Sequence, residues 1–320
     1  MIAALALAER GVGRTVKNPS VGCILVKNGL VVGRGWTQPG GRPHAEAMAL
    51  AQAGRKAKGA TAYVTLEPCA HKSERGPSCA SLLVDAAVEN VIIAAEDPDA
   101  RTAGQGVARL RASGIGCEIG VCEAEARNSL AGFFCRIAQR RPFVTLKLAI
   151  SIDGMIAMAD GSSRWITGET ARAHTHIERA RADAILVGAG TLRADNPRLD
   201  VRLAGLQDRS PRRIILGSGE PPAGWEIIRS PNEIATLDCN NLLVEGGAMT
   251  ASAFLKADLV DRLLLYRAPI LIGAGKSCLG DIGLRALEDA HWKWRLADSR
   301  MLGKDRLEVY ERANAQEAKS

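Results

Sequence analysis

The sequence predicts an α/β protein of two three-layer domains, each with a mostly parallel sheet covered by helices on both faces. Three observations favour this architecture. The 320 residues suggest two domains of ordinary size. Short apolar runs alternate with helical segments along most of the chain, which is typical of parallel sheets. A charged cluster that ends in a proline, residues 139–142, separates a first domain, 1–139, from a second, 142–313, and a polar tail, 314–320, follows.

The elements of the first domain are placed by their apolar patterns and by the turn residues between them. Asn28-Gly29, between two apolar runs, is a hairpin turn signal. The predicted helices span 1–13, 44–51, 79–87, 122–138 and part of 101–111, and the predicted strands span 21–26, 30–33, 62–66, 91–95 and 117–121.

The second domain opens with a strand directly after the boundary proline. A helix introduced by Trp165-Ile-Thr167 runs to Arg181, and another covers 248–255. One buried strand ends at Ala189-Gly-Thr191. The predicted strands span 143–150, 184–188, 212–216, 241–244, 263–266 and 307–310.

Three residues of types that bind zinc follow one another in the first domain, in the order His44, Cys69 and Cys79. One imidazole and two thiolates leave a fourth position for water, as in catalytic zinc sites. Glu46, two residues after the histidine, fits a proton shuttle for that water. The order H-x-E, then P-C, then a second cysteine, is the signature of zinc deaminases. The alternative is a core histidine, a solvated glutamate and two buried free thiols.

The composition restricts the class of protein. No run reaches the roughly 18 apolar residues that cross a bilayer, and the apolar start, residues 1–14, reads as a helix rather than a signal peptide. Eight scattered cysteines suit a reducing cytoplasm better than a disulfide framework. The net charge of +7 could indicate nucleic acid, but only 4% of residues are aromatic. We therefore expect phosphorylated small molecules as partners, and neither nucleic acid nor membrane.

Two strand ends in the second domain are candidate phosphate sites. Gly188-Ala-Gly-Thr191 and Glu245-Gly-Gly247 each follow an apolar strand, where backbone N–H groups and a helix N-terminus can meet an anion. No G-x-G-x-x-G follows a strand, so a Rossmann domain is not favoured. In the first domain, the amide of Asn18 could read a pyrimidine edge or only cap the turn at Pro19.

Over roughly residues 3–312, the chain resembles the bifunctional deaminase–reductases of riboflavin biosynthesis, the RibD type. The resemblance implies a cytidine-deaminase-like N-terminal domain, a dihydrofolate-reductase-like C-terminal domain and a homodimer through the latter. It is carried by motifs in a fixed order: NPSVGCILV, HAEAMAL, YVTLEPCAH, the Asp97-Pro-Asp stretch, RPFVTLKLAISIDG, SRWITG, RADAILVGAGTLRADNP and VEGG.

The resemblance also implies two successive reactions. Zinc held by His44, Cys69 and Cys79, with Glu46 as proton shuttle, would deaminate 2,5-diamino-6-ribosylamino-4(3H)-pyrimidinone 5′-phosphate. NADPH would then reduce the ribosyl group of 5-amino-6-(5-phosphoribosylamino)uracil to ribityl, the cofactor supplying the reactivity and the protein the position.

Binding residues follow from the same resemblance. The deaminase substrate would meet Asn18, His71 and Arg75. NADPH would be lined by Ala149, Trp165, Thr191, Asp195 and Gly247, and the reductase substrate by Ser163, Arg179, Leu199, Arg202 and Glu245. Our own hypothesis adds Lys147, at the end of the first strand of the domain, as a residue that orients the sugar.

Several of these positions have a plainer interpretation. Trp165 could be an ordinary core residue, Arg179 a charge on a helix surface, Asp195 only the cap of the following Asn-Pro turn, and Arg75 a solvated loop charge. Arg75 also stands where the family usually has lysine, in a loop that carries one residue more than the usual family spacing. Nine residues separate the two cysteines, whereas the general deaminase signature has two.

Two other functions compete with the bifunctional enzyme. One is a nucleic-acid-editing deaminase with an RNA-binding C-terminal half, which the WITG, VGAGT and VEGG motifs and the few aromatic residues disfavour. The other is a chain with one inactive domain, serving as a reductase alone or as a scaffold. The intact set His44, Glu46, Cys69 and Cys79 disfavours an inactive deaminase.

Overall fold

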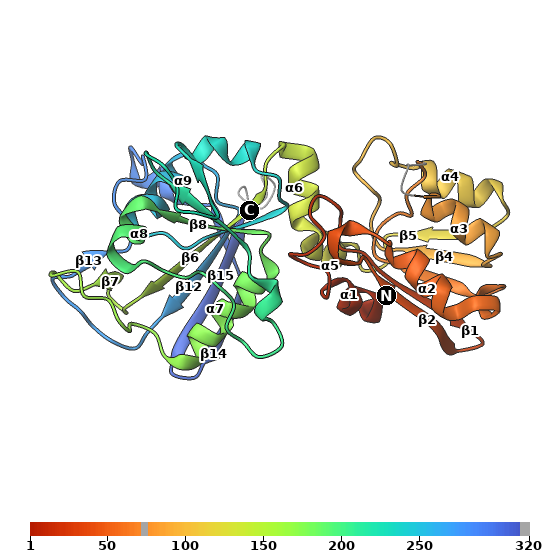
Figure 1. Ribbon diagram of the computed structural model, residues 1–320, viewed down its shortest axis with the longest axis horizontal. Coiled ribbons are helices and arrows are strands. Elements are labelled where there is room, and N and C mark those ends of the chain that lie inside the picture. The colour runs from red at the N-terminus through yellow and green to blue at the C-terminus, as the bar shows by residue number, and fades with distance from the viewer. Residues whose placement is uncertain (72–75, 314–320) are drawn as a thin grey trace. The chain divides into compact units, whose positions relative to one another are not determined.

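A computed structural model describes residues 1–71 and 76–313. The chain divides into two compact units, Met1–Arg141 and Pro142–Ser320 (Figure 1). Each unit has its own hydrophobic core and is described by itself.

The sheet of the N-terminal unit has the strand order β2-β1-β3-β4-β5. The hairpin strand β1 runs antiparallel to both of its neighbours, whereas the last three strands are mutually parallel. The sheet is therefore mixed, and our expectation of a mostly parallel sheet holds only for its second half. The strands are β1 (Gly22–Lys27), β2 (Leu30–Trp36), β3 (Thr61–Val64), β4 (Asn90–Ile93) and β5 (Gly116–Ile119).

Helices cover both faces of this sheet because glycines let two of them approach the hairpin closely. A Cβ on Gly22 would lie 1.9 Å from the carbonyl oxygen of Ala4 in α1, and one on Gly35 would lie 2.1 Å from that of Ala45 in α2. Gly35 pairs with the residue after Gly22, so these two positions face opposite sides. The helices are α1 (Ile2–Ala8), α2 (Ala45–Ala53), α3 (Cys79–Asp85), α4 (Gln105–Ala112), α5 (Glu123–Ser129) and α6 (Ala131–Gln139).

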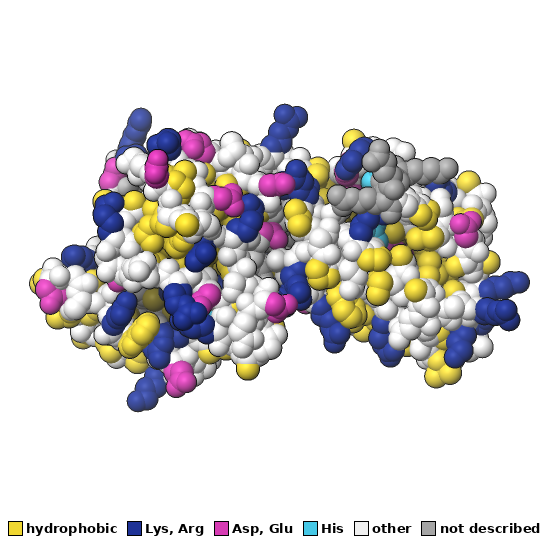
Figure 2. Space-filling view, viewed as in Figure 1, with side chains coloured by type: hydrophobic (Ala, Val, Ile, Leu, Met, Phe, Trp, Pro, Cys, Tyr) yellow, Lys and Arg dark blue, Asp and Glu magenta, His cyan; other side chains and the backbone are white. Residues whose placement is uncertain are grey.

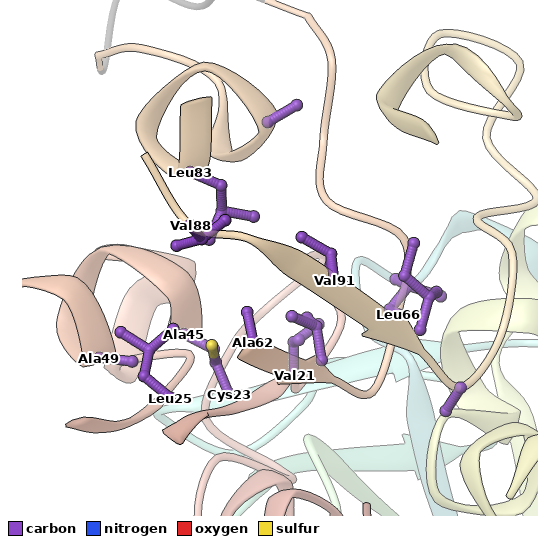
Figure 3. Close-up of a cluster of buried hydrophobic side chains, with 14 of the residues drawn as sticks. Val21, Cys23, Leu25, Ala45, Ala49, Ala62, Leu66, Leu83, Val88 and Val91 are labelled. Atoms are coloured by element: carbon purple, nitrogen blue, oxygen red, sulfur yellow. The ribbon is translucent and has the colours of Figure 1, made fainter. Parts of the chain in front are cut away.

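The packing of α2 against β1 fixes the start of that helix. Figure 3 shows Ala45 and Ala49 beside Cys23 and Leu25, and all four side chains are buried. The small side chains of Ala45 and Ala49 allow this contact, and larger ones would meet the packed interior. The residues around the first turn of α2 are therefore held by the core.

Two helices of this unit differ from our prediction. The first helix ends at Ala8, before the glycines at which we ended it, and turns follow. The segment predicted as one helix over 122–138 breaks at Leu130, where α5 ends and α6 begins. The weak helix formers Asn128, Ser129 and Gly132 flank this break, and our prediction gave their low propensity too little weight.

The C-terminal unit has an eight-stranded sheet among its described residues, in the order β10-β9-β8-β11-β6-β12-β15-β14. The first six strands in this order are parallel, and β15 and β14 add an antiparallel edge. A separate short pair joins β7 to β13. The strands are β6 (Phe143–Ile150), β7 (Met155–Ala157), β8 (Ala184–Gly188), β9 (Arg212–Leu216), β10 (Trp225–Ile228), β11 (Asn241–Val244), β12 (Arg262–Arg267), β13 (Lys276–Ser277), β14 (Trp294–Leu302) and β15 (Asp305–Arg312).

Alternate residues of the central strands enter different clusters. Leu242 and Val244 of β11 pack with Phe254 of α9 (Ala248–Lys256), whereas Leu243 belongs to a second cluster with Val187. Tyr266 packs with Ala171 of α7 (Glu169–Arg181) in a third. The two faces of the sheet therefore have separate helical covers, which gives the expected three layers.

Sequence patterns missed four strands and one helix in this unit. The strands β7, β10, β13 and β14 are short or lie at edges, where little apolar periodicity is needed. The residues Ala189–Thr191, which we expected only to end a strand, begin the helix α8 (Ala189–Asp195). The helix α7 begins at Glu169, with Gly168 as its N-cap.

The surface and the helices also bear on the class of protein. Among the described residues, no helix combines the length and the apolar character that crossing a membrane would require. On the face shown in Figure 2, Lys and Arg side chains are spread over both units and acidic side chains are interspersed among them.

Candidate active sites

The three predicted zinc ligands lie together in the N-terminal unit. Their ligand atoms are all within 4.8 Å of one another, among residues that the structure describes. His44 Nδ1 is 3.2 Å from Cys79 Sγ and 3.7 Å from Cys69 Sγ. His44 is the N-cap of α2, Cys69 follows β3, and Cys79 is the first residue of α3. Three separate elements therefore deliver one imidazole and two thiols to one point.

The protonation of these groups suits a divalent cation. A hydrogen bond from Cys79, helped by one from His44, lowers the pKa of Cys69 to about 4, although burial opposes the shift. The hydrogen bond that the Cys79 thiol donates to the Cys69 thiolate, together with burial, raises the pKa of Cys79. The two shifts favour a thiolate at Cys69 and a thiol at Cys79, and metal binding would release the proton of the latter. A His-Cys-Cys donor set of this kind fits zinc with one open position.

Glu46 lies in the first turn of α2, two residues after His44. Its side chain is 3% exposed, and burial raises the pKa of its carboxyl. The carboxyl also interacts with Cys79. A carboxyl in this environment exchanges a proton more readily near neutral pH than an exposed one does.

A residue that our sequence analysis missed organises the loop behind this site. The buried carboxylate of Glu67, two residues before Cys69, accepts backbone hydrogen bonds from Asp97 at 3.3 Å, Gly104 at 3.0 Å and Val107 at 3.1 Å. A carboxylate that accepts several N–H groups holds a loop firmly. A glutamate directly before Pro-Cys, at the end of a strand, was the available signal.

The three predicted substrate contacts of this unit have different outcomes. The Nδ1 atom of His71 lies 3.4 Å from the hydroxyl oxygen of Thr102, within hydrogen-bonding distance. Asn18 donates to the carbonyl of Thr15 at 3.4 Å and lies against Gly41, shortly before His44. The amide thus bonds within its own turn and lies against the loop that leads to His44. Arg75 lies outside the described residues.

A cavity of about 740 Å³ lies in the C-terminal unit, at the carboxyl ends of β8 and β11, where open α/β sheets bind ligands. Its walls come from β6, α7, α8 and the loops 163–167 and 196–202. The structure brings together every residue that we predicted for the reductase. These are Lys147, Ala149, Ser163, Trp165, Arg179, Thr191, Asp195, Leu199, Arg202, Glu245 and Gly247.

A buried ion pair crosses the floor of the cavity. Arg179 donates to Glu245 through Nε at 2.7 Å and through Nη2 at 2.9 Å, and the two side chains are only 12% and 8% exposed. Arg179 is therefore not the surface charge that the plainer interpretation allowed. Burial lowers the pKa of Lys147, and the nearby Glu245 partly offsets this effect. Two cations and one carboxylate on this floor leave positive charge for an anionic ligand.

Trp165 and Asp195 lie at the rim. Trp165 is 68% exposed, so it is not a core residue, and the guanidinium of Arg172 lies 4.7 Å from its ring centre. Such a cation–π contact holds an exposed indole in place. Asp195 is the exposed last residue of α8 rather than part of the Asn-Pro turn that follows.

The two glycine-rich strand ends meet beside the cavity. The N–H of Gly247, the N-cap of α9, donates to the hydroxyl of Thr191 in α8 at 3.3 Å. A Cβ atom added to Gly247 would have its nearest neighbour 3.6 Å away, and one added to Gly190 would have its nearest neighbour 3.9 Å away. The backbone at both glycines is therefore uncrowded, and Gly247 lines the cavity. An uncrowded backbone at a helix N-terminus suits a phosphate.

Our sequence analysis missed several polar residues of the cavity wall. His176, on α7 one turn before Arg179, donates through Nδ1 to the carbonyl of Asp200 at 3.1 Å. Helical spacing from Arg179 was the only signal for it. The other missed residues are Arg164, Arg172, Thr175 and Arg198.

Two protein families match the chain. The family described as "Cytidine and deoxycytidylate deaminase zinc-binding region" matches residues 1–95. The family described as "RibD C-terminal domain" matches residues 142–224 and 232–307. These matches cover the unit with the His-Cys-Cys cluster and the unit with the cavity.

Similar proteins match nearly the whole chain. "Riboflavin biosynthesis protein RibD" of Aquifex aeolicus is 38% identical, over 97% of this chain and 96% of that protein. The protein of the same name from Escherichia coli K12 is also 38% identical, over 95% and 96%.

Solved structures give the same result. "Acinetobacter baumannii RibD, form 1" matches with a TM-score of 0.89 and 35% identity, over 98% of both chains. A Thermotoga maritima protein, titled a diaminohydroxyphosphoribosylaminopyrimidine deaminase/5-amino-6-(5-phosphoribosylamino)uracil reductase, matches with a TM-score of 0.86 and 31% identity, over 98% of this chain and 97% of that one.

Proposed function

The chain belongs to the RibD family, the bifunctional deaminase–reductases of riboflavin biosynthesis, and from this premise we propose the substrates, cofactor and residues of its two reactions. The N-terminal unit deaminates 2,5-diamino-6-ribosylamino-4(3H)-pyrimidinone 5′-phosphate. The C-terminal unit then reduces the ribosyl group of 5-amino-6-(5-phosphoribosylamino)uracil to ribityl with NADPH. The observation that carries the first reaction is the convergence of His44, Cys69 and Cys79 beside a buried Glu46.

In the deamination, water replaces the ring amino group and ammonia leaves. Zinc, when bound by His44, Cys69 and Cys79, makes water a nucleophile near neutral pH. Glu46 accepts the proton of that water and delivers it to the ring nitrogen and then to the departing amine. Its raised pKa supports both halves of this transfer, since one group must accept and donate within a single turnover. His71 and Arg75 bind the substrate.

In the reduction, a hydride adds to C1 of the ribosyl group, and a proton completes the ribityl product. NADPH supplies the hydride when it is bound. Ala149, Trp165, Thr191, Asp195 and Gly247 line the cofactor, which the open backbone at the strand ends supports.

The substrate occupies the remaining part of the cavity. Lys147 orients the sugar, and Ser163 and Leu199 line its path. Arg179 and Arg202 bind the phosphate, which the excess of positive charge on the floor and rim supports. Glu245 holds Arg179 in place through both carboxylate oxygens.

A mass-spectrometric time course tests this function. Purified full-length protein of known zinc content receives the diaminopyrimidinone ribosyl phosphate, first without and then with NADPH. We expect a gain of about one mass unit without NADPH, since OH replaces NH₂, and about two more with it, since a hydride and a proton are added. No first step despite bound zinc would contradict the substrate assignment, and nucleosides and tRNA would then be tried. NADH in place of NADPH checks the cofactor.

We also propose that the chain forms a homodimer through its reductase unit. The edge strand β14 supports this, because among the described residues it is the last strand of its sheet, and Leu296 and Met301 on it are 51% and 63% exposed. Sedimentation should give twice the mass of one chain, and Leu296→Glu or Met301→Glu should halve it. The same change at Val31, exposed on β2, is the matched control. A wild-type protein that sediments as a single chain contradicts the proposal.

The eight free cysteines support a reducing compartment, which we propose is the cytoplasm. Oxidation of the pair at the metal site would remove two ligands, because a disulfide does not bind zinc as two thiolates do. The proposed chemistry therefore depends on thiols that stay reduced.

A further inference from the structure

We propose that the carboxylate of Asp200 is an internal counter-ion of the phosphate subsite in the reductase cavity. The carboxylate forms ion pairs with Arg198 and Arg202, and a phosphorylated ligand must displace it from both side chains in order to bind. It thereby lowers the affinity of the subsite for anions. This inference rests on the proposed function, which places the substrate phosphate at Arg202.

One carboxylate bridges the two arginines at the rim. Asp200 Oδ2 lies 2.7 Å from Arg198 Nη2, and Asp200 Oδ1 lies 2.8 Å from Arg202 Nη1. Both arginines line the cavity. A carboxylate and a phosphate present similar oxygen pairs to a guanidinium, so they compete for the same donors.

The loop does not need this carboxylate to keep its shape. The backbone carbonyl of Asp200 accepts from Arg179 Nη1 and from His176 Nδ1, each at 3.1 Å. The next N–H, that of Val201, donates to Ser210 Oγ at 3.0 Å, and the side chain of Leu199 is 3% exposed. The backbone is therefore anchored on both sides of the carboxylate by other groups.

The exposure of the three side chains indicates what the carboxylate does. Arg198 is 75% exposed and Arg202 is 49% exposed, whereas Asp200 is 23% exposed. Ion pairs with such exposed partners add little to stability. The main effect of the carboxylate is then to cancel one of two positive charges at the place where an anion must bind.

This cancellation lowers the affinity of the subsite for every anion alike, because each anion must displace the same carboxylate. The phosphorylated substrate has further contacts in the cavity that offset this cost, whereas inorganic phosphate has none. The subsite therefore stays available at concentrations of inorganic phosphate that would otherwise fill it.

The test measures inorganic phosphate binding to the full-length protein by calorimetry, together with inhibition of the reductase by phosphate. Asp200→Asn keeps the backbone contacts and removes the charge, so we expect its dissociation constant for phosphate to fall about tenfold, the scale of one unit charge at the rim. Asp200→Ser gives a second variant, and thermal unfolding checks that both fold. The matched control is Glu226→Gln, which removes one charge from an exposed pair with Arg212 outside the cavity, and it should change phosphate binding less than twofold.

Two outcomes separate this inference from the proposed function. If both Asp200 variants bind phosphate equally or more weakly than the wild type, the carboxylate is a scaffold and the inference fails alone. If Arg202→Leu binds phosphate as the wild type does, the phosphate does not lie at Arg202. That result overturns the substrate assignment and the inference with it.

Discussion

A Glu46→Gln variant is expected to lose deamination almost completely while it keeps zinc and the reductase reaction. The amide has the size of the carboxyl but cannot accept a proton, and such a loss typically costs about 10²–10⁴-fold in rate. We expect about 10³-fold, because Glu46 is buried and its carboxyl interacts with Cys79 at the ligand cluster. The measurement is the rate of ammonia release from the diaminopyrimidinone ribosyl phosphate.

Two comparisons make this prediction specific. Cys79→Ser should lose zinc as well as deamination, because a hydroxyl replaces one of three ligands. Glu46→Gln should bind as much zinc as the wild type and reduce the aminouracil substrate at the wild-type rate. If both activities fell together in Glu46→Gln, the two sites would not be independent.

A Glu245→Gln variant is expected to destabilise the C-terminal unit and to weaken the reductase. Removing one partner of a buried pair typically costs about 3–5 kcal/mol, and this pair has two hydrogen bonds and little exposure. We expect about 3 kcal/mol, because Lys147, whose pKa burial already lowers, can lose its proton and relieve part of the unbalanced charge. Denaturant unfolding of the full-length protein measures the change.

The exposed pair between Arg212 and Glu226 gives the matched control. Glu226→Gln should change the free energy of unfolding by less than about 1 kcal/mol, as exposed pairs do. The double variant Arg179→Met, Glu245→Gln should be more stable than the sum of its single changes predicts, since it leaves no uncompensated partner. A Glu245→Gln variant as stable as the control would refute the energetic role of the buried pair.

The sequence predicted the parts of this protein that strong local chemistry determines. The His44, Cys69 and Cys79 cluster was found because few other uses require that order of ligands. The strands β6, β8, β9 and β11 matched their predicted bounds because they are short apolar runs between turn residues.

What the sequence did not predict depends on contacts between distant residues. Glu67 and His176 act on loops far along the chain, and the local signals at both residues do not identify the hydrogen-bond partners that give them their roles. The role of Asp200 depends on two arginines that meet it only once the loop 196–202 has folded. The edge strand β14 needs a partner strand rather than apolar periodicity, so it lacked the pattern that we used for strands.

The separate cores of the two units have a genetic consequence. The buried cluster around Cys23 and Leu25 draws its residues from the first 140 positions, and the cluster around Val144 and Phe254 only from later ones. Damage to one core is therefore confined to one chemistry, and inactivating alleles divide into two groups. Two chains that carry opposite lesions can restore the pathway between them in one cell, provided that the intermediate diffuses from one to the other.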